Sequence, residues 1–161
     1  MGLMDIYNEN RVQPAGSTAP DFVLPDQDGH DVSLSQLINE GLVLLYFYSR
    51  DGDPGVAEEL AELNRYYKKF REFGVVPVVI SSDPVERHLR YADEHEIIVP
   101  LLADPRQEVS KAYGVYNSSG INSRVSFIVS RDQEIVRVYS EQRTRSHVKE
   151  IYTNIRETLL D

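Results

Sequence analysis

The stretch Tyr46-Phe47-Tyr48-Ser49-Arg50-Asp51-Gly52-Asp53-Pro54-Gly55-Val56-Ala57 decides the fold of this chain. Its first three residues, 46–48, are the end of a near-continuous apolar run that begins at Gly41. Such a run is typical of a strand that is buried on both faces of a sheet. Asp is a favoured helix N-cap and Pro is favoured in the first helical turn. The stretch therefore predicts a buried strand, a tight turn and a helix that begins at Asp53-Pro54.

Strands and helices alternate along the rest of the chain. Alternation of this kind predicts a parallel sheet with right-handed crossovers, here with a closing antiparallel hairpin. Pro77 lacks an amide donor, which favours the start of a strand or a locally open edge. The expected strands are 21–24, 31–34, 41–48, 75–80, 99–102, 125–129 and 134–139. The expected helices are 35–38, 54–73, 83–95, one from about 105 and one from about 146.

This order resembles the thioredoxin-like α/β fold, a central mixed sheet flanked by helices, with an added N-terminal β-hairpin. The 161 residues fit one domain. We expect a flexible N-terminal arm over 1–18, because that segment is polar and lacks a clear period, and a single domain over 19–161. On the expected helix 83–95, Leu89 and Ala92 are expected to point inward, and His88 is expected on a solvated face.

Composition excludes several classes of function. The net charge of −9 disfavours nucleic-acid binding, which needs clustered Lys and Arg. No apolar run reaches the length of a membrane span, and no secretory signal is evident, so we expect a cytoplasmic protein that does not bind membranes. The chain has no cysteine, which excludes disulfides, thiolate metal sites and cysteine nucleophiles.

Eight short motifs occur in the order that the peroxiredoxin (alkyl hydroperoxide reductase/thiol-specific antioxidant) family shows, from about Ala15 to Leu160. The chain resembles this family, and looks most similar to its bacterioferritin-comigratory-protein branch. The motifs are Ala19-Pro20-Asp21-Phe22-Val23-Leu24, Val32-Ser33-Leu34-Ser35, Tyr46-Phe47-Tyr48, Asp53-Pro54-Gly55, Ile80-Ser81-Ser82-Asp83, Pro100-Leu101-Leu102-Ala103-Asp104, Lys111-Ala112-Tyr113-Gly114-Val115 and Arg124-Val125-Ser126-Phe127-Ile128-Val129.

The resemblance also assigns the family's site residues to positions in this chain. The proline that opens the family's motif is Ser49 here, the threonine is Asp53, and the peroxidatic cysteine is Val56. A resolving cysteine common in the branch would fall at Ala61. Only the peroxide-binding arginine is kept, at Arg124.

These changes remove the chemistry that the family performs. A peroxidatic cysteine attacks as a thiolate, stabilised by a helix N-terminus and a nearby arginine. Valine has no lone pair and cannot attack oxygen. We expect the Asp53 carboxylate to cap the helix, and its pairing with Arg124 is a further option; either arrangement cancels the positive field that an anionic nucleophile needs.

Other residue patterns have ordinary structural explanations. Asp26-Gln27-Asp28-Gly29 is interpreted as a hairpin turn, since a calcium loop would need a downstream glutamate where Leu37 stands. No metal site is predicted, because the histidines lie on separate elements or seven residues apart. No histidine base lies near a candidate serine nucleophile in sequence. The serines considered are Ser49, Ser123 and Ser126, and the histidines are His30, His88, His95 and His147.

The sequence leaves three hypotheses open. The first is a family member without thiol peroxidase activity, which acts by binding or regulation and uses no cofactor. The second is a different reaction, with Asp53 as acid/base and Arg124 holding an anionic substrate. The third is that an antioxidant or oxidoreductase label would describe ancestry only. The expected ligand site, for a small anion, comprises Asp53, Gly55, Val56 and Arg124, and the chain is expected to be a monomer or a homodimer.

Overall fold

A computed structural model of the chain describes residues 12–117, 122–140 and 147–159. Its central element is a five-stranded mixed sheet with the strand order β5-β4-β3-β6-β7. Strands β3, β4 and β5 run parallel, and β6 and β7 are antiparallel additions on the other side of β3. The sheet strands are β3 (Leu42–Phe47), β4 (Val75–Ser81), β5 (Leu101–Ala103), β6 (Val125–Val129) and β7 (Ile135–Ser140).

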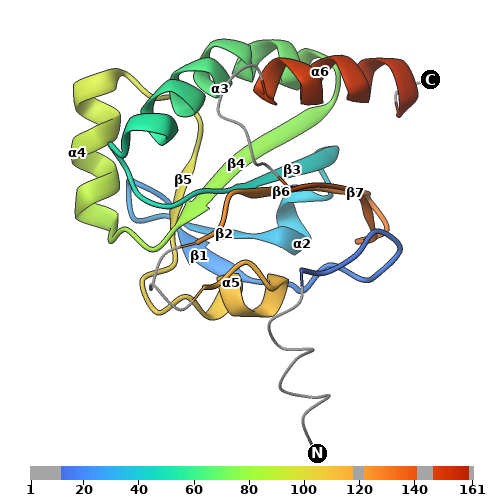
Figure 1. The fold of residues 1–161 in the computed structure, drawn as a ribbon, viewed down its shortest axis with the longest axis horizontal. Coiled ribbons are helices and arrows are strands. Elements are labelled where there is room, and N and C mark those ends of the chain that lie inside the picture. The colour runs from blue at the N-terminus through green and yellow to red at the C-terminus, as the bar shows by residue number, and fades with distance from the viewer. Residues whose placement is uncertain (1–11, 118–121, 141–146, 160–161) are drawn as a thin grey trace, which may run out of the picture.

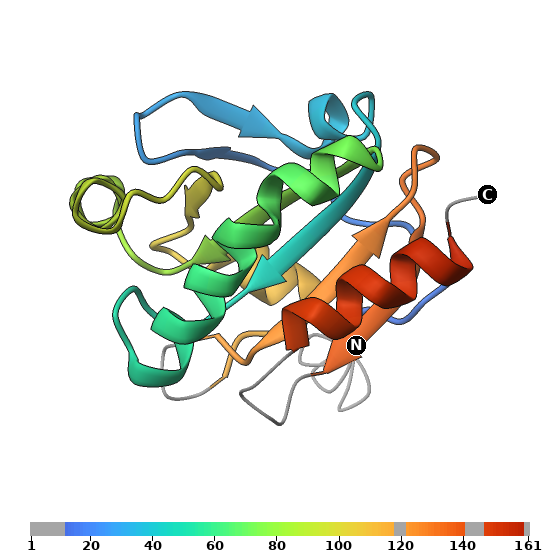
Figure 2. The same ribbon diagram turned by 90° about the horizontal axis from the view of Figure 1, so that it is seen from above.

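Helices and a hairpin cover the two faces of this sheet (Figure 1). Helices α3 (Pro54–Glu72) and α6 (His147–Thr158) lie side by side over one face, as the view from above also shows (Figure 2). The opposite face carries a separate hairpin and two short helices. Its elements are β1 (Val23–Pro25), β2 (Asp31–Ser33), α2 (Leu34–Leu37) and α5 (Glu108–Tyr113).

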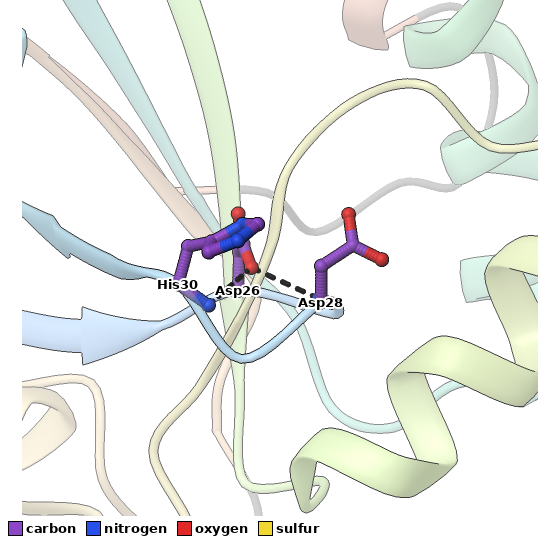
Figure 3. Close-up of side chains that lie close together, drawn as sticks. All are labelled: Asp26, Asp28 and His30. Atoms are coloured by element: carbon purple, nitrogen blue, oxygen red, sulfur yellow. Dashed lines mark hydrogen bonds between the residues drawn. The ribbon is translucent and has the colours of Figure 1, made fainter.

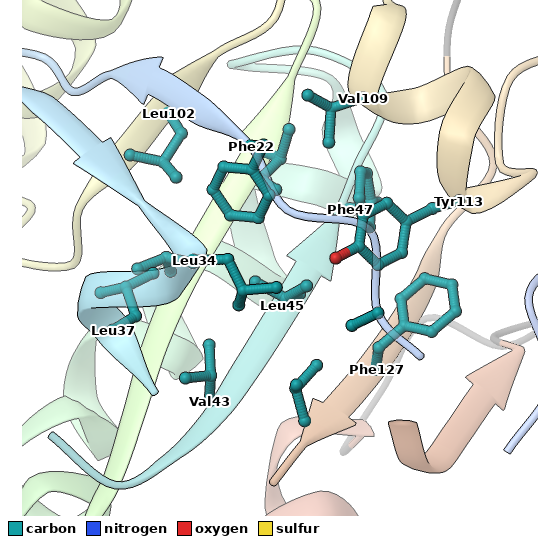
Figure 4. Packing of buried hydrophobic residues seen from close by; sticks show 14 of the residues in the cluster. Phe22, Leu34, Leu37, Val43, Leu45, Phe47, Leu102, Val109, Tyr113 and Phe127 are labelled. Atoms are coloured by element: carbon teal, nitrogen blue, oxygen red, sulfur yellow. The ribbon is translucent and has the colours of Figure 1, made fainter. Parts of the chain in front are cut away.

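Strand β3 contributes side chains to the hydrophobic cores on both faces of the sheet, because successive side chains of a strand point to opposite faces. Val43, Leu45 and Phe47 join the core beneath the hairpin and α5, where the rings of Phe47, Tyr113 and Phe127 lie 5.1–5.7 Å apart between centroids (Figure 4). Residues 44, 46 and 48 join the second core under α3 and α6. The buried strand expected from the apolar run is therefore confirmed.

Pro77 lies inside β4, and its position fits the expected open edge. It pairs with Leu44 of β3 on one side, whereas β5 pairs only with residues 79–81 on the other side. The proline thus faces a stretch of β4 that β5 does not reach, where a missing N–H costs no ladder hydrogen bond.

The start of the domain differs from the expectation of a loose arm over 1–18. Residues 1–11 lie outside the described residues, but the Gln13 amide donates to the Tyr113 carbonyl at 3.1 Å and the Gly16 amide donates to the Ile135 carbonyl at 2.7 Å. Thr18 forms an isolated bridge with Glu134. The segment from Gln13 onward is therefore hydrogen-bonded to α5 and β7, a tertiary contact that its polar sequence does not reveal.

Candidate functional site

Helix α3 begins where the sequence predicts, and it places Val56 in its first turn. Asp53 is the N-cap residue and Pro54 is the first helical residue. The Val56 side chain is only 2% exposed, so it points into the core rather than toward solvent. Gly55 and Asp53 are half-buried beside it.

The Asp53 carboxylate does not make the expected capping bond. It accepts a hydrogen bond from the Ser49 hydroxyl at 2.9 Å, and no side-chain bond joins it to the helix amides. The N-cap position was predicted correctly, but its capping interaction was not. The hydrogen bond between Ser49 and Asp53 instead joins the two ends of the turn that precedes α3.

Arg124 pairs with Glu59 and not with Asp53. The guanidinium Nη2 lies 2.5 Å from Glu59 Oε2, and the Tyr46 hydroxyl donates to Glu59 Oε1 at 2.6 Å. Glu59 is 3% exposed and Arg124 is 20% exposed by side chain. The structure pairs Asp53 with Ser49 and Arg124 with Glu59, so the pairing of Asp53 with Arg124 that we considered is wrong.

Sequence reasoning missed Glu59, although a signal was present. Residues three apart on a helix share one face, so a carboxylate three residues after Val56 lies on the same inward face. Glu59 and Val56 both line one small cavity, with Tyr46, Tyr48 and Leu60 among its other walls. This cavity offers about 10 Å³ to the centre of a water molecule, which is at the lower limit for holding one water. The cavity is therefore too small for a ligand larger than one water molecule.

A second buried polar cluster lies on the other side of the same turn. His88 of α4 (Val85–His95) is fully buried, which corrects the prediction of a solvated face, and Leu89 is 41% exposed instead of inward. His88 Nδ1 lies 2.7 Å from Asp51 Oδ2, and His88 Nε2 lies 3.2 Å from the Ser81 hydroxyl oxygen.

Asp83 and Tyr48 complete this cluster. The Ser81 hydroxyl donates to Asp83 Oδ2 at 2.6 Å, and the Asp51 amide donates to the same oxygen at 2.9 Å. The Tyr48 hydroxyl donates to Asp51 Oδ1. Burial, together with the neighbouring Asp51 carboxylate, raises the pKa of the Tyr48 phenol well above its usual value.

Two groups of side chains bring together atoms of the kind that ligate metals. Asp26, Asp28 and His30 lie on the β1–β2 turn, where Asp26 Oδ1 accepts from the Asp28 amide at 2.9 Å and from the His30 amide at 3.0 Å (Figure 3). The second group is Asp51, Asp83 and His88. Hydrogen bonds already account for both arrangements, the first as a turn and the second as the buried cluster.

The same turn also borders an open cleft of about 360 Å³ on the surface. Its walls carry charges of both signs, from Arg87, Arg90 and Glu94 of α4 and from Asp51, so the cleft has no clear preference for an anion or a cation. Arg87 is itself paired with Asp83, at 3.1 Å from Nε to Oδ1.

Comparison with known proteins identifies the family and agrees with this fold. Residues 15–138 match the model of the AhpC/TSA family, and the chain belongs to that family. It is similar to peroxiredoxin Bcp of Escherichia coli K12, with 32% identity over 141 residues that cover 83% of this chain and 89% of that protein. It is also 32% identical to a chloroplastic peroxiredoxin Q of Sedum lineare, over 84% of this chain and 74% of that protein.

Solved structures show the same thioredoxin-like architecture. The crystal structure of peroxidoxin BcpB from Mycobacterium tuberculosis superposes with a TM-score of 0.84 at 29% identity, covering 92% of this chain and 99% of that one. A cysteine-to-serine mutant of Xylella fastidiosa PrxQ gives a TM-score of 0.83 at 20% identity, covering 91% and 98%, and supports the fold alone. The present chain has the family's scaffold and no cysteine.

Proposed function

We propose that this protein is a peroxiredoxin homologue that has lost thiol peroxidase activity and acts by binding or regulation. The observation that carries the proposal is Val56, a buried hydrocarbon side chain in the first turn of α3. The resemblance assigns the reactive cysteine to this position. Reduction of a peroxide by the family's route needs a thiolate that takes up oxygen as sulfenic acid, and the chain supplies no sulfur there.

The charges around Val56 support the proposal. A thiolate or a peroxide anion would need the free positive field of Arg124, whereas Glu59 pairs with that guanidinium and accepts a further hydrogen bond from Tyr46. An anionic substrate at Arg124 would have to compete with a buried carboxylate, which is costly to leave unpaired. For this reason we do not favour a different reaction that uses Asp53 and Arg124.

The kind of ligand follows from the same geometry. A small anion near Arg124 remains our prediction. Arg124 does not line the cavity beside Val56, and that cavity, of about 10 Å³, is too small for such an anion. A ligand site that joins Val56 to Arg124 would therefore need a change of conformation in the turn ahead of α3. A protein partner would instead use the outer surface.

A peroxide-consumption assay tests the loss of activity. Purified protein is mixed with hydrogen peroxide and either dithiothreitol or thioredoxin with its reductase, and remaining peroxide is followed with time. We expect the rate in buffer alone, because no side chain can form a sulfenic acid. Peroxiredoxin Bcp of Escherichia coli, assayed beside it, serves as the positive control.

Turnover that scales with the concentration of this protein would overturn the proposal. Contaminating peroxidase is excluded only when the activity follows the protein through a second chromatographic step. A negative result leaves binding and regulation as the roles to be pursued.

A further inference from the structure

We infer that Asp51 and His88 form a buried ion pair that locks the turn ahead of α3 against helix α4, and so holds the Val56 cavity closed. The two residues are 37 positions apart in sequence, and their side chains meet at 2.7 Å. Asp51 is 4% exposed and His88 is fully buried. This inference is independent of whether the protein binds a ligand or reduces peroxide.

The hydrogen-bond partners of His88 favour a ring that carries both protons. Its Nδ1 faces the Asp51 carboxylate, which only accepts, so Nδ1 must donate. Its Nε2 faces the Ser81 oxygen, whose own proton is directed to Asp83 Oδ2 at 2.6 Å. With the Ser81 proton directed to Asp83, the 3.2 Å contact is satisfied by an N–H donor on Nε2, and the inferred ring is then an imidazolium.

The charged groups around His88 come from three elements and balance one another. Asp51 from the turn after β3 and Asp83 from the end of β4 supply two negative charges. His88 and Arg87 of α4 supply two positive charges, and Arg87 Nε contacts Asp83 Oδ1 at 3.1 Å. Burial, together with the nearby Asp51 carboxylate, raises the pKa of Tyr91 on the same helix. The cluster is thus neutral as a whole only while His88 is charged.

Tyr48 connects this ion pair to the cavity at Val56. Its ring lines the cavity with Val56 and Glu59, and its hydroxyl donates to Asp51. The turn has one further anchor of its own, the bond from the Asp51 amide to Asp83. Outward movement of the turn would therefore break the Asp51–His88 contact and release the hydroxyl of Tyr48, whose ring forms one wall of the cavity.

A lock of this kind has a distinctive response to mutation. Removing one member of a buried ion pair leaves the other charge uncompensated, which is strongly destabilising, whereas replacing both members by apolar residues is often tolerated. The effect of His88→Leu should therefore be large when Asp51 is present and small when Asp51 is already alanine.

The chain offers a clean reporter, since it has no natural cysteine. A Val56→Cys variant places one thiol in the closed cavity, and its rate of reaction with a thiol-specific reagent measures how often the cavity opens. A Val129→Cys variant places a matched thiol in the other core, where Val129 is fully buried, and reports global opening.

In the Val56→Cys background we expect His88→Leu to speed labelling by about 100-fold or more, because an uncompensated buried charge favours the open turn. Asp51→Ala should also speed it, and the combination of both should be no faster than either alone. In the Val129→Cys background the same substitutions should change labelling far less. In the natural protein, nitrogen NMR of His88 should show both ring nitrogens protonated at pH 7.

Three results would overturn the inference. The first is that Val56→Cys is still labelled at the parent rate when His88 is replaced. The second is that the effects of Asp51→Ala and His88→Leu on the labelling rate simply multiply. The third is equal acceleration of labelling at both reporter cysteines, which would mean that the pair supports global stability only. A neutral His88 ring in the NMR spectrum would also contradict it.

Discussion

At the scale of single residues, Val56 and Asp53 change the family's site in different ways. Val56 stands where the resemblance places the reactive cysteine, and its hydrocarbon side chain cannot act as a nucleophile. Asp53 adds a carboxylate at the N-cap, three residues before Val56, and that carboxylate bonds to Ser49 rather than to the helix amides. Its charge therefore adds to the local negative potential while the helix N-terminus stays positive.

This division predicts the outcome of restoring the thiol. In Val56→Cys the Asp53 carboxylate should raise the pKa of the new thiol, whereas Val56→Cys with Asp53→Thr should ionise at lower pH by about one unit, a tenfold gain in thiolate at neutral pH. The pH dependence of thiol alkylation and the rate of peroxide consumption measure both variants. We expect little activity from the single variant and more from the double variant.

Glu58→Gln provides a matched control, because Glu58 is exposed on the same helix and its removal changes the net charge equally. Combined with Val56→Cys, it should alter the thiol much less than Asp53→Thr does. If the single and double variants ionise at the same pH and reduce peroxide equally well, Asp53 has no electrostatic role.

At the scale of elements, helix α4 shows where a sequence pattern reaches its limit. Both His88 and Leu89 are spaced to share a face with Ala92, at four and three residues before it. Hydrophobicity favours Leu89 as the inward residue, yet the structure buries His88 and exposes Leu89. The deciding partner, Asp51, lies on another element, so the helix pattern alone could not select the histidine.

The backbones of β3 and β4 approach each other closely where the two strands begin. Gly41 and Gly74 precede the two central parallel strands, and the Leu42 amide donates to the Gly74 carbonyl at 3.0 Å. A Cβ atom built on Gly41 would lie 2.0 Å from that carbonyl oxygen. The close approach of the two backbones thus depends on the missing side chain.

We therefore expect Gly41→Ala to destabilise the fold by about 2 kcal/mol or more, because the clash forces the backbones apart and weakens the first ladder bond. Urea denaturation measures the free energy of unfolding. Gly29→Ala is the control, since no atom lies within 4 Å of its Cβ position and only its positive φ of 83° is strained. A loss from Gly41→Ala no larger than that from Gly29→Ala would contradict the packing argument.

At the scale of the whole molecule, the two cores on either side of the sheet contain no sulfur chemistry. The chain has no cysteine, and its two methionines, Met1 and Met4, lie outside the described residues. Within the residues that the structure describes, no helix is long and apolar enough to cross a bilayer. Disulfide bonds therefore make no contribution to the stability of this fold.

The fold should accordingly be indifferent to redox conditions. We expect the same midpoint of thermal unfolding after treatment with dithiothreitol, with diamide or with hydrogen peroxide, because the cores have no group that these reagents oxidise or reduce. Circular dichroism on heating measures the midpoint. A shift beyond the scatter of repeats would reveal an oxidisable group that matters for stability.

The sequence by itself determined the order of the elements and the absence of a cysteine nucleophile. Local patterns set the former, such as the apolar run of β3 and the Asp53-Pro54 helix start, and a chain without cysteine cannot gain a thiol by folding. Only the tertiary structure decided that Arg124 pairs with Glu59 and His88 with Asp51. Those pairs join residues 65 and 37 positions apart, and their geometry depends on how the sheet and helices pack rather than on any local pattern.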